Sequence, residues 1–391
     1  MRISRRRLLT GLGAACCTAA SPFVTPVVFA AAPGENRLVV IVLRGGLDGL
    51  GMVQPYGDRA YQSLRQGLLE RPGEGLIDLD GFFGLSRHFA ALAPMWQAGE
   101  LGFAHAVSTP YRGKRSHFDG QDFLENGGNE ASGGLTPSRD GWLNRALELI
   151  PGTKSNYAMA VGREHMLILA GAQEAGSWSP VAELTLADDE RRLLSLLYAK
   201  DPLFAKALSE ANQLSALGGG REGGAQRETG AVLAGFTAEM LNGPSRIAAF
   251  SLGGWDTHRG QDRAMVRPAA ALAKALTTLR DRLGRNWERT AVVALTEFGR
   301  TARQNGSNGT DHGTGGVMML AGGAIRGGRI YGDWPGLGEG DLYENRDLMP
   351  TSDVRRYAGW ALTGLFGLRR ADIESTVFPG LDMESDPGMI A

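Results

Sequence analysis

Runs of apolar, often β-branched residues recur along the chain, and each is followed by a glycine-rich polar stretch. The two clearest runs are RLVVIVL at Arg37–Leu43 and TAVVAL at Thr290–Leu295. A nearly continuous apolar run of this length is typical of a strand that is covered on both faces of a parallel sheet. The pattern predicts strands at 37–43, 101–107, 157–161, 246–252, 290–295 and 316–320.

Segments with a helical spacing of apolar residues lie between these strands. They are predicted at 58–69, 88–97, 116–124, 142–150, 188–217, 228–241, 268–283 and 354–366. Strands that alternate with helices indicate an α/β fold, here a three-layer α/β/α sandwich with a mostly parallel central sheet. The stretch 180–243 holds no cluster of ligand-like side chains, so we interpret it as a helical insertion into a single α/β domain at 33–391.

The first 32 residues are predicted to be a twin-arginine signal peptide rather than part of the fold. The run SRRRLL begins at Ser4, and an apolar stretch then ends in three alanines that suit a signal peptidase. A short membrane anchor is the alternative, but Pro22, Pro26 and the scarcity of long aliphatic residues favour cleavage. The expected location is periplasmic or secreted, with the Tat translocase as partner during export and no permanent membrane anchor.

Composition narrows the chemistry of the exported part. Loss of residues 1–32 removes four arginines and no acids, which leaves 37 basic against 42 acidic residues and a net charge of −5. That charge argues against a nucleic-acid partner. Both cysteines, Cys16 and Cys17, leave with the signal. Any metal site must therefore use His, Asp, Glu, Ser or Thr.

Four of the predicted strands or their following segments end in residues that can bind metal or react. These residues are Asp48, Ser116, Asp256 with His258, and Glu297 with Asp311 and His312. Sites in open α/β sheets form outside the carboxyl ends of the strands. Asp256 and His258 are two residues apart, so in an extended segment they share a face. Such pairs suit zinc, the preferred expectation, manganese or iron, while an all-oxygen set would suit magnesium or calcium.

Ser116 is the candidate nucleophile, with Arg115 and His117 beside it as catalytic neighbours. It is predicted to open a helix, where free backbone amides attract an anion. Arg44 and Arg300 are the candidate substrate-binding residues. The plainer alternative for Ser116 is a helix N-cap.

Plainer alternatives also exist for the candidate metal ligands. An aspartate between glycines, such as Asp48, is by default a turn residue, and Asp311-His312-Gly313 taken alone could be a surface turn. Of the remaining histidines, His165 has no convincing ligand partner near it in sequence, His105 lies inside a predicted strand and is ambiguous, and His88 lies on a predicted helix with apolar neighbours. We interpret His88 as a packing residue.

The combined motifs resemble those of an exported bacterial family of unknown function, DUF1501, that usually carries twin-arginine signals. The segments that carry the resemblance are LRGGLDGL, RSHFDGQDFLENG, GGWDTH, TEFGRTARQNGSNGTDHGTGG and GGRIYGDWPGL, which span most of the exported chain. This family is similar to the alkaline phosphatase/sulfatase superfamily. The resemblance implies that Asp48, the pair Asp256/His258 and the pair Asp311/His312 bind metal, and that Ser116 attacks.

The sequence departs from the superfamily pattern in three ways. Its first Asp/His pair is closely spaced, Glu297 directly follows the strand where a pair is expected, and no histidine follows His312. One metal, an altered pair of metals and a degenerate binding site all stay open. The first hypothesis is an exported metal-dependent hydrolase of small phosphate or sulfate esters. The second is a non-catalytic envelope protein that keeps the fold and binds an anionic glycan or another partner.

Overall fold

Within residues 34–128, 140–179 and 229–391, which the computed structural model describes, the largest element is a nine-stranded sheet. Its order is β11-β5-β10-β9-β1-β8-β6-β7, with β12 beside β5. The strands are β1 (Arg37–Leu43), β5 (Leu101–Ser108), β6 (Ala158–Val161), β7 (Gly176–Trp178), β8 (Ile247–Leu252), β9 (Thr290–Leu295), β10 (Gly316–Ala321), β11 (Ile330–Tyr331) and β12 (Ser352–Asp353).

Most neighbouring strands run in the same direction. β1 pairs in parallel with β8 on one side and with β9 on the other, so that Leu43 lies beside Leu252 and Val42 beside Leu295. β10 runs antiparallel to both of its neighbours, β9 and β5. The predicted α/β fold with a mostly parallel sheet is confirmed, and the carboxyl ends of β1, β8 and β9 meet at one edge.

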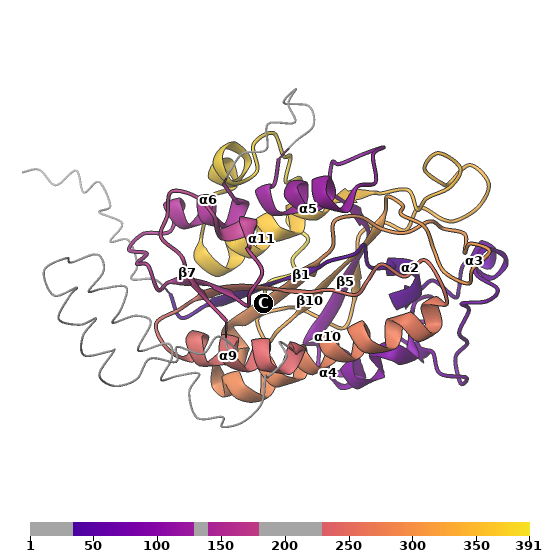
Figure 1. Cartoon of the computed structure of the whole chain (residues 1–391), viewed down its shortest axis with the longest axis horizontal. Helices are drawn as coiled ribbons and strands as arrows, with labels where there is room; N and C mark the ends of the chain where they lie inside the picture. The colour runs from indigo at the N-terminus through magenta and orange to yellow at the C-terminus, as the bar shows by residue number, and fades with distance from the viewer. Residues whose placement is uncertain (1–33, 129–139, 180–228) are drawn as a thin grey trace, which may run out of the picture.

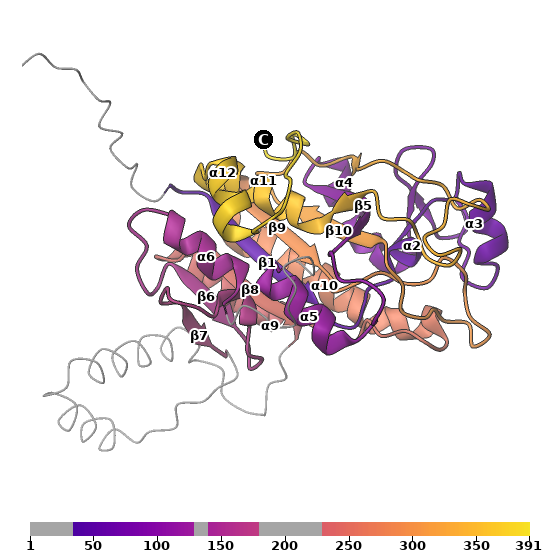
Figure 2. The same ribbon diagram turned by 90° about the horizontal axis from the view of Figure 1, so that it is seen from above.

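Helices cover both faces of the sheet, which gives three layers (Figure 1). One face carries α5 (His117–Asn126), α6 (Trp142–Leu149) and α11 (Val354–Phe366), which spread over the sheet when it is viewed from above (Figure 2). The other carries α4 (Ala93–Gln97), α9 (Gly230–Asn242) and α10 (Gln261–Leu283). β1 shows why both layers form: its alternate side chains enter two separate hydrophobic cores.

Shorter elements connect these strands and helices. A small sheet in the order β2-β4-β3 joins β2 (Val53–Gln54), β4 (Gly84–Leu85) and β3 (Ile77–Asp78). The short helices are α2 (Gly49–Met52), α3 (Arg59–Leu64), a 3-10 helix at Arg87–Leu92, two more at Leu167–Leu169 and Gly284–Arg289, α12 (Arg370–Asp372) and a π-helical turn at Ile373–Val377. No helix in the described part of the chain is long and apolar enough to span a membrane.

The strands were easier to predict than the starts of the helices. Arg37–Leu43 and Thr290–Leu295 form as expected, whereas α10 begins at Gln261 and carries Pro268 in its interior. The predicted start at residue 268 is therefore wrong: the helix begins seven residues earlier, after Gly260, which has the left-handed φ of 49°. The predicted signal peptide and the predicted helix at 188–217 lie outside the described residues. α9, at the end of the expected insertion, packs against α10 in the helical layer.

Candidate metal centre

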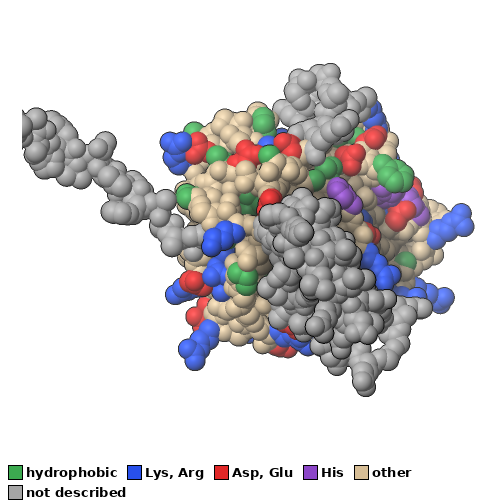
Figure 3. Space-filling model, turned by 60° about the vertical axis from the view of Figure 1, so that its left-hand side comes forward, with side chains coloured by type: hydrophobic (Ala, Val, Ile, Leu, Met, Phe, Trp, Pro, Cys, Tyr) green, Lys and Arg blue, Asp and Glu red, His purple; other side chains and the backbone are tan. Residues whose placement is uncertain are grey.

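Four segments from distant parts of the sequence meet at the carboxyl edge of the sheet. They are the turn after β1, the first turn of α5, the loop after β8 and the long loop between β9 and β10. Histidine side chains reach the surface beside acidic ones in the space-filling view (Figure 3). The site forms here because parallel strands bring their polar ends to the same edge.

The turn after β1 lets two of these segments approach closely. Gly45 has φ 121°, and a Cβ at this position would lie 2.7 Å from the backbone nitrogen of Asp256. Its own N–H donates to Glu297 Oε1 at 2.9 Å. Gly46 also has a positive φ, 67°, so both glycines adopt turn conformations that other residues rarely take, and any side chain at Gly45 would push the Asp256 loop away.

The loop between β9 and β10 folds back on itself and returns Asp311 and His312 to the edge it left. Arg300 and His312 form an isolated antiparallel bridge, and Gly313 donates its N–H to the carbonyl of Gly299 at 2.8 Å. Asn305 fixes the tip, since its side-chain oxygen accepts from the N–H groups of Ser307 and Gly309. This is why ligand-like residues that follow their strand by a whole loop can still reach the site.

Three imidazoles surround one oxygen of Asp256. The distances from Asp256 Oδ1 are 3.0 Å to Nε2 of His258, 3.2 Å to Nε2 of His312 and 3.5 Å to Nε2 of His117. The Nε2 atoms of His258 and His312 are 2.9 Å apart. The predicted same-face placement of Asp256 and His258 is confirmed, because the intervening Thr257 is buried and bonds Gln261 instead.

The other ring nitrogen of each histidine already has a partner. Nδ1 of His117 lies 2.8 Å from Glu297 Oε1, and Nδ1 of His258 lies 3.1 Å from Asp311 Oδ1. Nδ1 of His312 lies 2.9 Å from the carbonyl oxygen of Arg115. Histidines that bind metal commonly donate their second N–H to a carboxylate or a carbonyl in this way. Each ring is therefore oriented with Nε2 available toward the centre.

One of these Nε2 atoms is buried without a hydrogen bond. Within the described residues, His117 Nε2 has no hydrogen-bond partner although it is shielded from solvent. His117, Asp256 and His312 each present one ligand atom within 4.8 Å of the others. A divalent cation would satisfy all of these atoms at once, and nitrogen with carboxylate oxygen is a donor set that zinc accepts. The residues present thus fit a metal.

Charges around the centre keep its carboxylates ionised. Burial works to raise the pKa of Asp256, but the hydrogen bond and charge of Arg300, 2.7 Å away, hold it below its ordinary value. For Glu297, burial also works to raise the pKa, but the hydrogen bonds from His117, Gln121 and the backbone together hold it below its ordinary value. The hydrogen bond to Glu297 raises the pKa of His117, while burial lowers the pKa of His312.

Glu297 and Asp311 lie behind the histidines rather than among the central atoms. Glu297 is fully buried and bonds His117, Gly45 and Gln121. Asp311 bonds His258 and the side-chain amide of Asn305. Both were predicted as direct ligands, but the geometry assigns them to orienting His117 and His258. His117, predicted as a catalytic neighbour of Ser116, lies among the candidate ligands.

Asp48, the other predicted ligand, lies away from the centre. It is completely buried, and Arg65 contacts both of its oxygens, at 2.5 and 3.0 Å. Gln261 also donates to it. A carboxylate with these partners is already neutralised and has little room for a cation. The expected position of Asp48 is corrected accordingly: it belongs to an internal ion pair.

The predicted substrate-binding arginines are likewise committed to the protein. Arg300 is 1 % exposed, and its guanidinium donates to four backbone carbonyls as well as to Asp256. Arg44 pairs with Glu125 at 2.8 Å and Glu164 at 2.7 Å. Arg300 therefore positions Asp256, and Arg44 braces the outer wall, so neither has the free charge that an anion-binding role requires.

Ser116 and Arg115 directly precede His117, one of the residues of the centre. Ser116 is the N-cap of α5, and its hydroxyl accepts from the N–H of Asp119 at 3.4 Å. His117, the next residue, is the first of the helix and points to the centre. Arg115 has φ 54°, an unusual conformation for a residue with a side chain, and its carbonyl meets His312. The predicted helix start at Ser116 is confirmed, while the attacking role stays a prediction.

Sequence reasoning overlooked two polar residues that hold this arrangement together. Gln121 lies four residues after His117 on α5, and its amide donates to the same Glu297 oxygen, at 3.1 Å. Asn305 joins the loop tip to Asp311. The i, i+4 spacing of His117 and Gln121 could have revealed the first, since such residues share a helix face. The second had no local signal.

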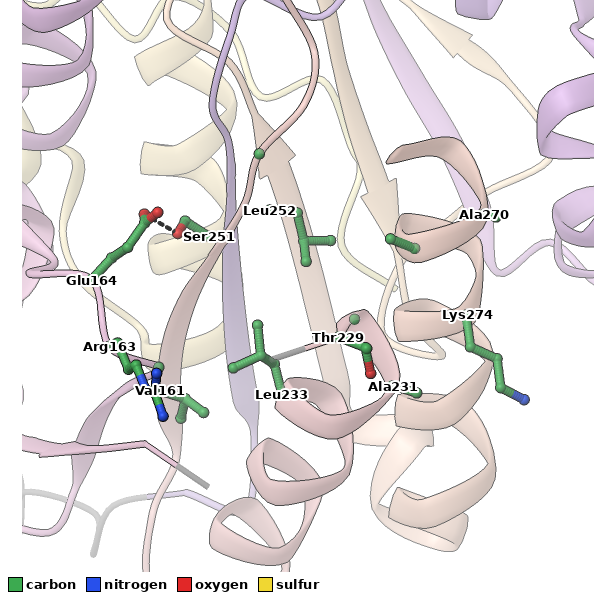
Figure 4. Close-up of a pocket in the computed structure, with 14 residues that line it drawn as sticks. Val161, Arg163, Glu164, Thr229, Ala231, Leu233, Ser251, Leu252, Ala270 and Lys274 are labelled. Carbon is green, nitrogen blue, oxygen red and sulfur yellow. Dashed lines mark hydrogen bonds between the residues drawn. The ribbon is translucent and has the colours of Figure 1, made fainter. Parts of the chain in front are cut away.

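A cavity of about 740 Å³ lies beside this network, where β6 and β8 end (Figure 4). Glu164 on its wall accepts a hydrogen bond from Ser251 and pairs with Arg44. Arg44 in turn donates to Gln121 at 2.8 Å, which leads to Glu297 and His117. The cavity wall and the candidate metal centre therefore share a continuous set of polar contacts.

Fold and site together define an α/β protein with a candidate histidine–carboxylate metal centre at the carboxyl edge of its sheet. The chain belongs to the family described as "Protein of unknown function (DUF1501)", which it matches over residues 102–376. No curated protein matches the chain.

Among solved structures, the chain is similar to several enzymes at low sequence identity. The PsFucS1 sulfatase from Pseudoalteromonas sp. is 14% identical with a TM-score of 0.42, covering 90% of this chain and 73% of that one. The lipoteichoic acid synthase LtaP from Listeria monocytogenes is 10% identical with a TM-score of 0.41, covering 94% and 78%. The alkaline phosphatase from the Antarctic bacterium TAB5 is 11% identical with a TM-score of 0.36, covering 77% and 95%.

Proposed function

We propose that this protein is a metal-dependent hydrolase of phosphate or sulfate esters. The observation that supports it best is the arrangement of His117, His258 and His312. Their Nε2 atoms lie within 3.5 Å of Asp256 Oδ1, and every Nδ1 is held from behind. An ion pair or a packing cluster does not require three imidazoles oriented in this way, whereas a metal centre does.

Zinc is the preferred metal because imidazole nitrogen and carboxylate oxygen are ligands it takes readily; manganese, magnesium and calcium are the alternatives. His117, His258, His312 and Asp256 would hold the ion. When bound, it would act as a Lewis acid toward an oxygen of the ester. Arg300 keeps Asp256 ionised and in place, and Glu297 and Asp311 keep two of the rings oriented.

Ser116 is the proposed nucleophile. Its oxygen would form a bond to the phosphorus or sulfur atom while the bond from that atom to the leaving alcohol oxygen breaks, and water would later release the acid and restore the serine. Two observations favour it over other hydroxyls. It directly precedes His117, and it follows a residue held in a left-handed conformation. Strain of that kind is often found at functional sites.

Ser116→Ala tests the nucleophile and the reaction class together. The variant should lower kcat on an aryl phosphate or aryl sulfate ester by about 1,000-fold or more, because a covalent nucleophile is lost. Its metal content, measured by elemental analysis, should equal that of the wild type. Ser375→Ala is the matched control, since Ser375 is exposed and far along the chain in the π-helical turn. Full activity of Ser116→Ala would overturn the covalent route.

The second candidate is a non-catalytic envelope protein that binds an anionic glycan or another partner. It is favoured by the commitment of Arg44 and Arg300 to protein carboxylates and carbonyls, which leaves neither to stabilise a transferring group. A metal-loaded wild type that turns over neither aryl ester, yet binds a sulfated or phosphorylated glycan, would support this candidate over the hydrolase.

Export completes the proposal. The twin-arginine run at Ser4 and the alanines at 30–32 support release into the periplasm or medium. These residues lie outside those that the structure describes. The substrate would then be a small anionic ester or glycan of that compartment, and the Tat translocase a partner only during export.

A further inference from the structure

A second group of ligand-forming side chains lies away from the Asp256 centre and shares no residue with it. It consists of Glu70, His88 and Asp262, each of which offers one ligand atom within 4.8 Å of the others. Glu70 comes from the loop after α3, His88 from the 3-10 helix Arg87–Leu92 and Asp262 from the first turn of α10. His88 was interpreted as a packing residue; its largely buried ring also contacts Asp262.

Glu70 is a buried carboxylate with only neutral partners. The residue is 7% exposed, and its two oxygens accept from the Ser86 hydroxyl at 2.7 Å and the Arg87 N–H at 2.8 Å. No ion pair of Glu70 occurs in the described portion of the chain. A buried charge ordinarily needs a counter-charge, and each carboxylate oxygen can accept more than one bond. Glu70 is therefore able to accept a cation.

His88 and Asp262 face Glu70 from the neighbouring segments. His88 Nε2 lies 2.9 Å from Asp262 Oδ1, and the His88 side chain is 13% exposed. Arg87 also contacts this aspartate, but its side chain is 46% exposed and can turn into solvent. A simple ion pair would account for Asp262 with His88 and Arg87. Glu70 takes no part in that ion pair; its bonds with Ser86 and Arg87 hold it at the start of the 3-10 helix, where it lines the same cavity as His88 and Asp262.

Space for an ion and its water ligands exists at this point. A cavity of about 270 Å³ is lined by all three residues, with Gln54, Ser86 and Gln261 among its other walls. A single water requires far less volume than this. One imidazole, two carboxylates and two or three waters make a coordination set suited to zinc or manganese.

We propose that Glu70, His88 and Asp262 bind a second divalent cation, which has a structural role. The cation would join the segment 70–88 to the start of α10. Gln261, next to Asp262, bonds the side chains of Asp48, Thr257 and Thr310. Thr257 separates the two centre residues Asp256 and His258. A cation at Asp262 thus braces the loop that carries part of the first centre.

Zinc titration of the purified chain separates the two centres. The wild type should bind two equivalents by calorimetry and by elemental analysis after dialysis. A background variant with Asp256→Asn and His312→Ala, which lacks the first centre, should bind one equivalent of zinc. Adding Asp262→Asn or His88→Gln to that background should remove this remaining equivalent. Zinc at 100 times its dissociation constant should raise the Tm of the background by about 3–5 °C, and Asp262→Asn should abolish the rise.

Asp281→Asn on the same helix is the matched control, because Asp281 is exposed and should leave both equivalents unchanged. Asp262 has a side chain that is 50% exposed, so its replacement should not prevent folding. The proposal is overturned if the background variant binds no zinc, or if it still binds one equivalent after Asp262→Asn and after His88→Gln. Failure of the first centre would look different: the wild type would then bind one equivalent, lost on Asp262→Asn and kept on His312→Ala.

Discussion

Asp48 and Asp256 follow neighbouring strands, β1 and β8, after glycine-rich turns, yet they have different surroundings. Asp48 has no exposed surface and is held by Arg65 and Gln261. The Asp256 side chain is 46% exposed and faces three imidazoles, with Arg300 on one side only. The carboxylate of Asp48 is buried and already has its hydrogen-bond partners, whereas the carboxylate of Asp256 faces atoms that can bind the same metal ion.

The difference teaches that a strand-end aspartate acquires its role from partners that are distant in sequence. Arg65 lies 17 residues from Asp48, and it also donates to the carbonyls of Thr301 and Ala302. Asp48 and Arg65 thereby connect the β1 turn to the loop that delivers His312. One aspartate supports the frame of the site, and the other belongs to its centre. Three substitutions test this division.

Asp48→Asn should have the largest effect on stability and a small effect on metal affinity. Removing one partner of a buried ion pair leaves the other charge uncompensated and costs about 3–5 kcal/mol. Urea unfolding of the metal-free protein measures this loss. Zinc affinity, measured by chelator competition, should change less than about tenfold, because Asp48 does not face the histidines. A loss of zinc affinity much greater than that, with stability unchanged, would place Asp48 in the metal centre after all.

The pH dependence of the same variant sharpens the test. Burial works to raise the pKa of Asp48, but the charge and hydrogen bonds of Arg65 hold it below its ordinary value. A carboxylate with a lowered pKa stabilises the fold above its unfolded pKa, about 3.9, and loses that contribution as the pH falls through the folded value. The stability difference between wild type and Asp48→Asn should therefore be constant near neutral pH and shrink below about pH 4. Adding Arg65→Met should recover part of the loss.

His312→Ala should show the reverse pattern. The ring contributes Nε2 to the centre, so its loss should lower zinc affinity by at least about 100-fold. That is the upper end of the range for losing a residue that only orients a ligand, and a direct ligand should matter at least as much. The free energy of unfolding of the metal-free variant should lie within about 1 kcal/mol of that of the metal-free wild type, because the ring lies at a partly exposed site. His165→Ala, an exposed histidine outside the centre, is the control. Equal zinc affinity of the two alanine variants would remove His312 from the centre.

The same contrast explains how far the sequence could lead. The apolar runs at Arg37–Leu43 and Thr290–Leu295 predict strands because burial on both faces leaves little choice of residue. The Asp256-Thr257-His258 spacing predicts a shared face because extended backbone alternates its side chains. The partners Arg65 and Arg300 could not be predicted, since nothing in a single sequence indicates which arginine meets which carboxylate. Glu297 was misplaced for a related reason: it follows its strand directly, but His117 stands between it and the centre.

Glu297→Gln should have the smallest effect, and it tests whether the carboxylate orients His117. A glutamine oxygen can still accept from His117 Nδ1, so the ring keeps its position while the negative charge behind it is lost. Loss of such an outer partner costs about 10–100-fold in metal affinity, and zinc binding at pH 8 should fall within that range. The hydrogen bond that His117 donates to Glu297 raises the pKa of His117 above its ordinary value, so protons compete with metal for the wild-type ring as the pH falls. In the variant the pKa of His117 should fall back, so the difference in zinc affinity between wild type and Glu297→Gln should be smaller at pH 6 than at pH 8.

Chelator competition at both pH values measures this difference, with the exposed Glu288→Gln as control. A gap that is constant with pH would mean that Glu297 supports the fold of this edge and does not act through His117.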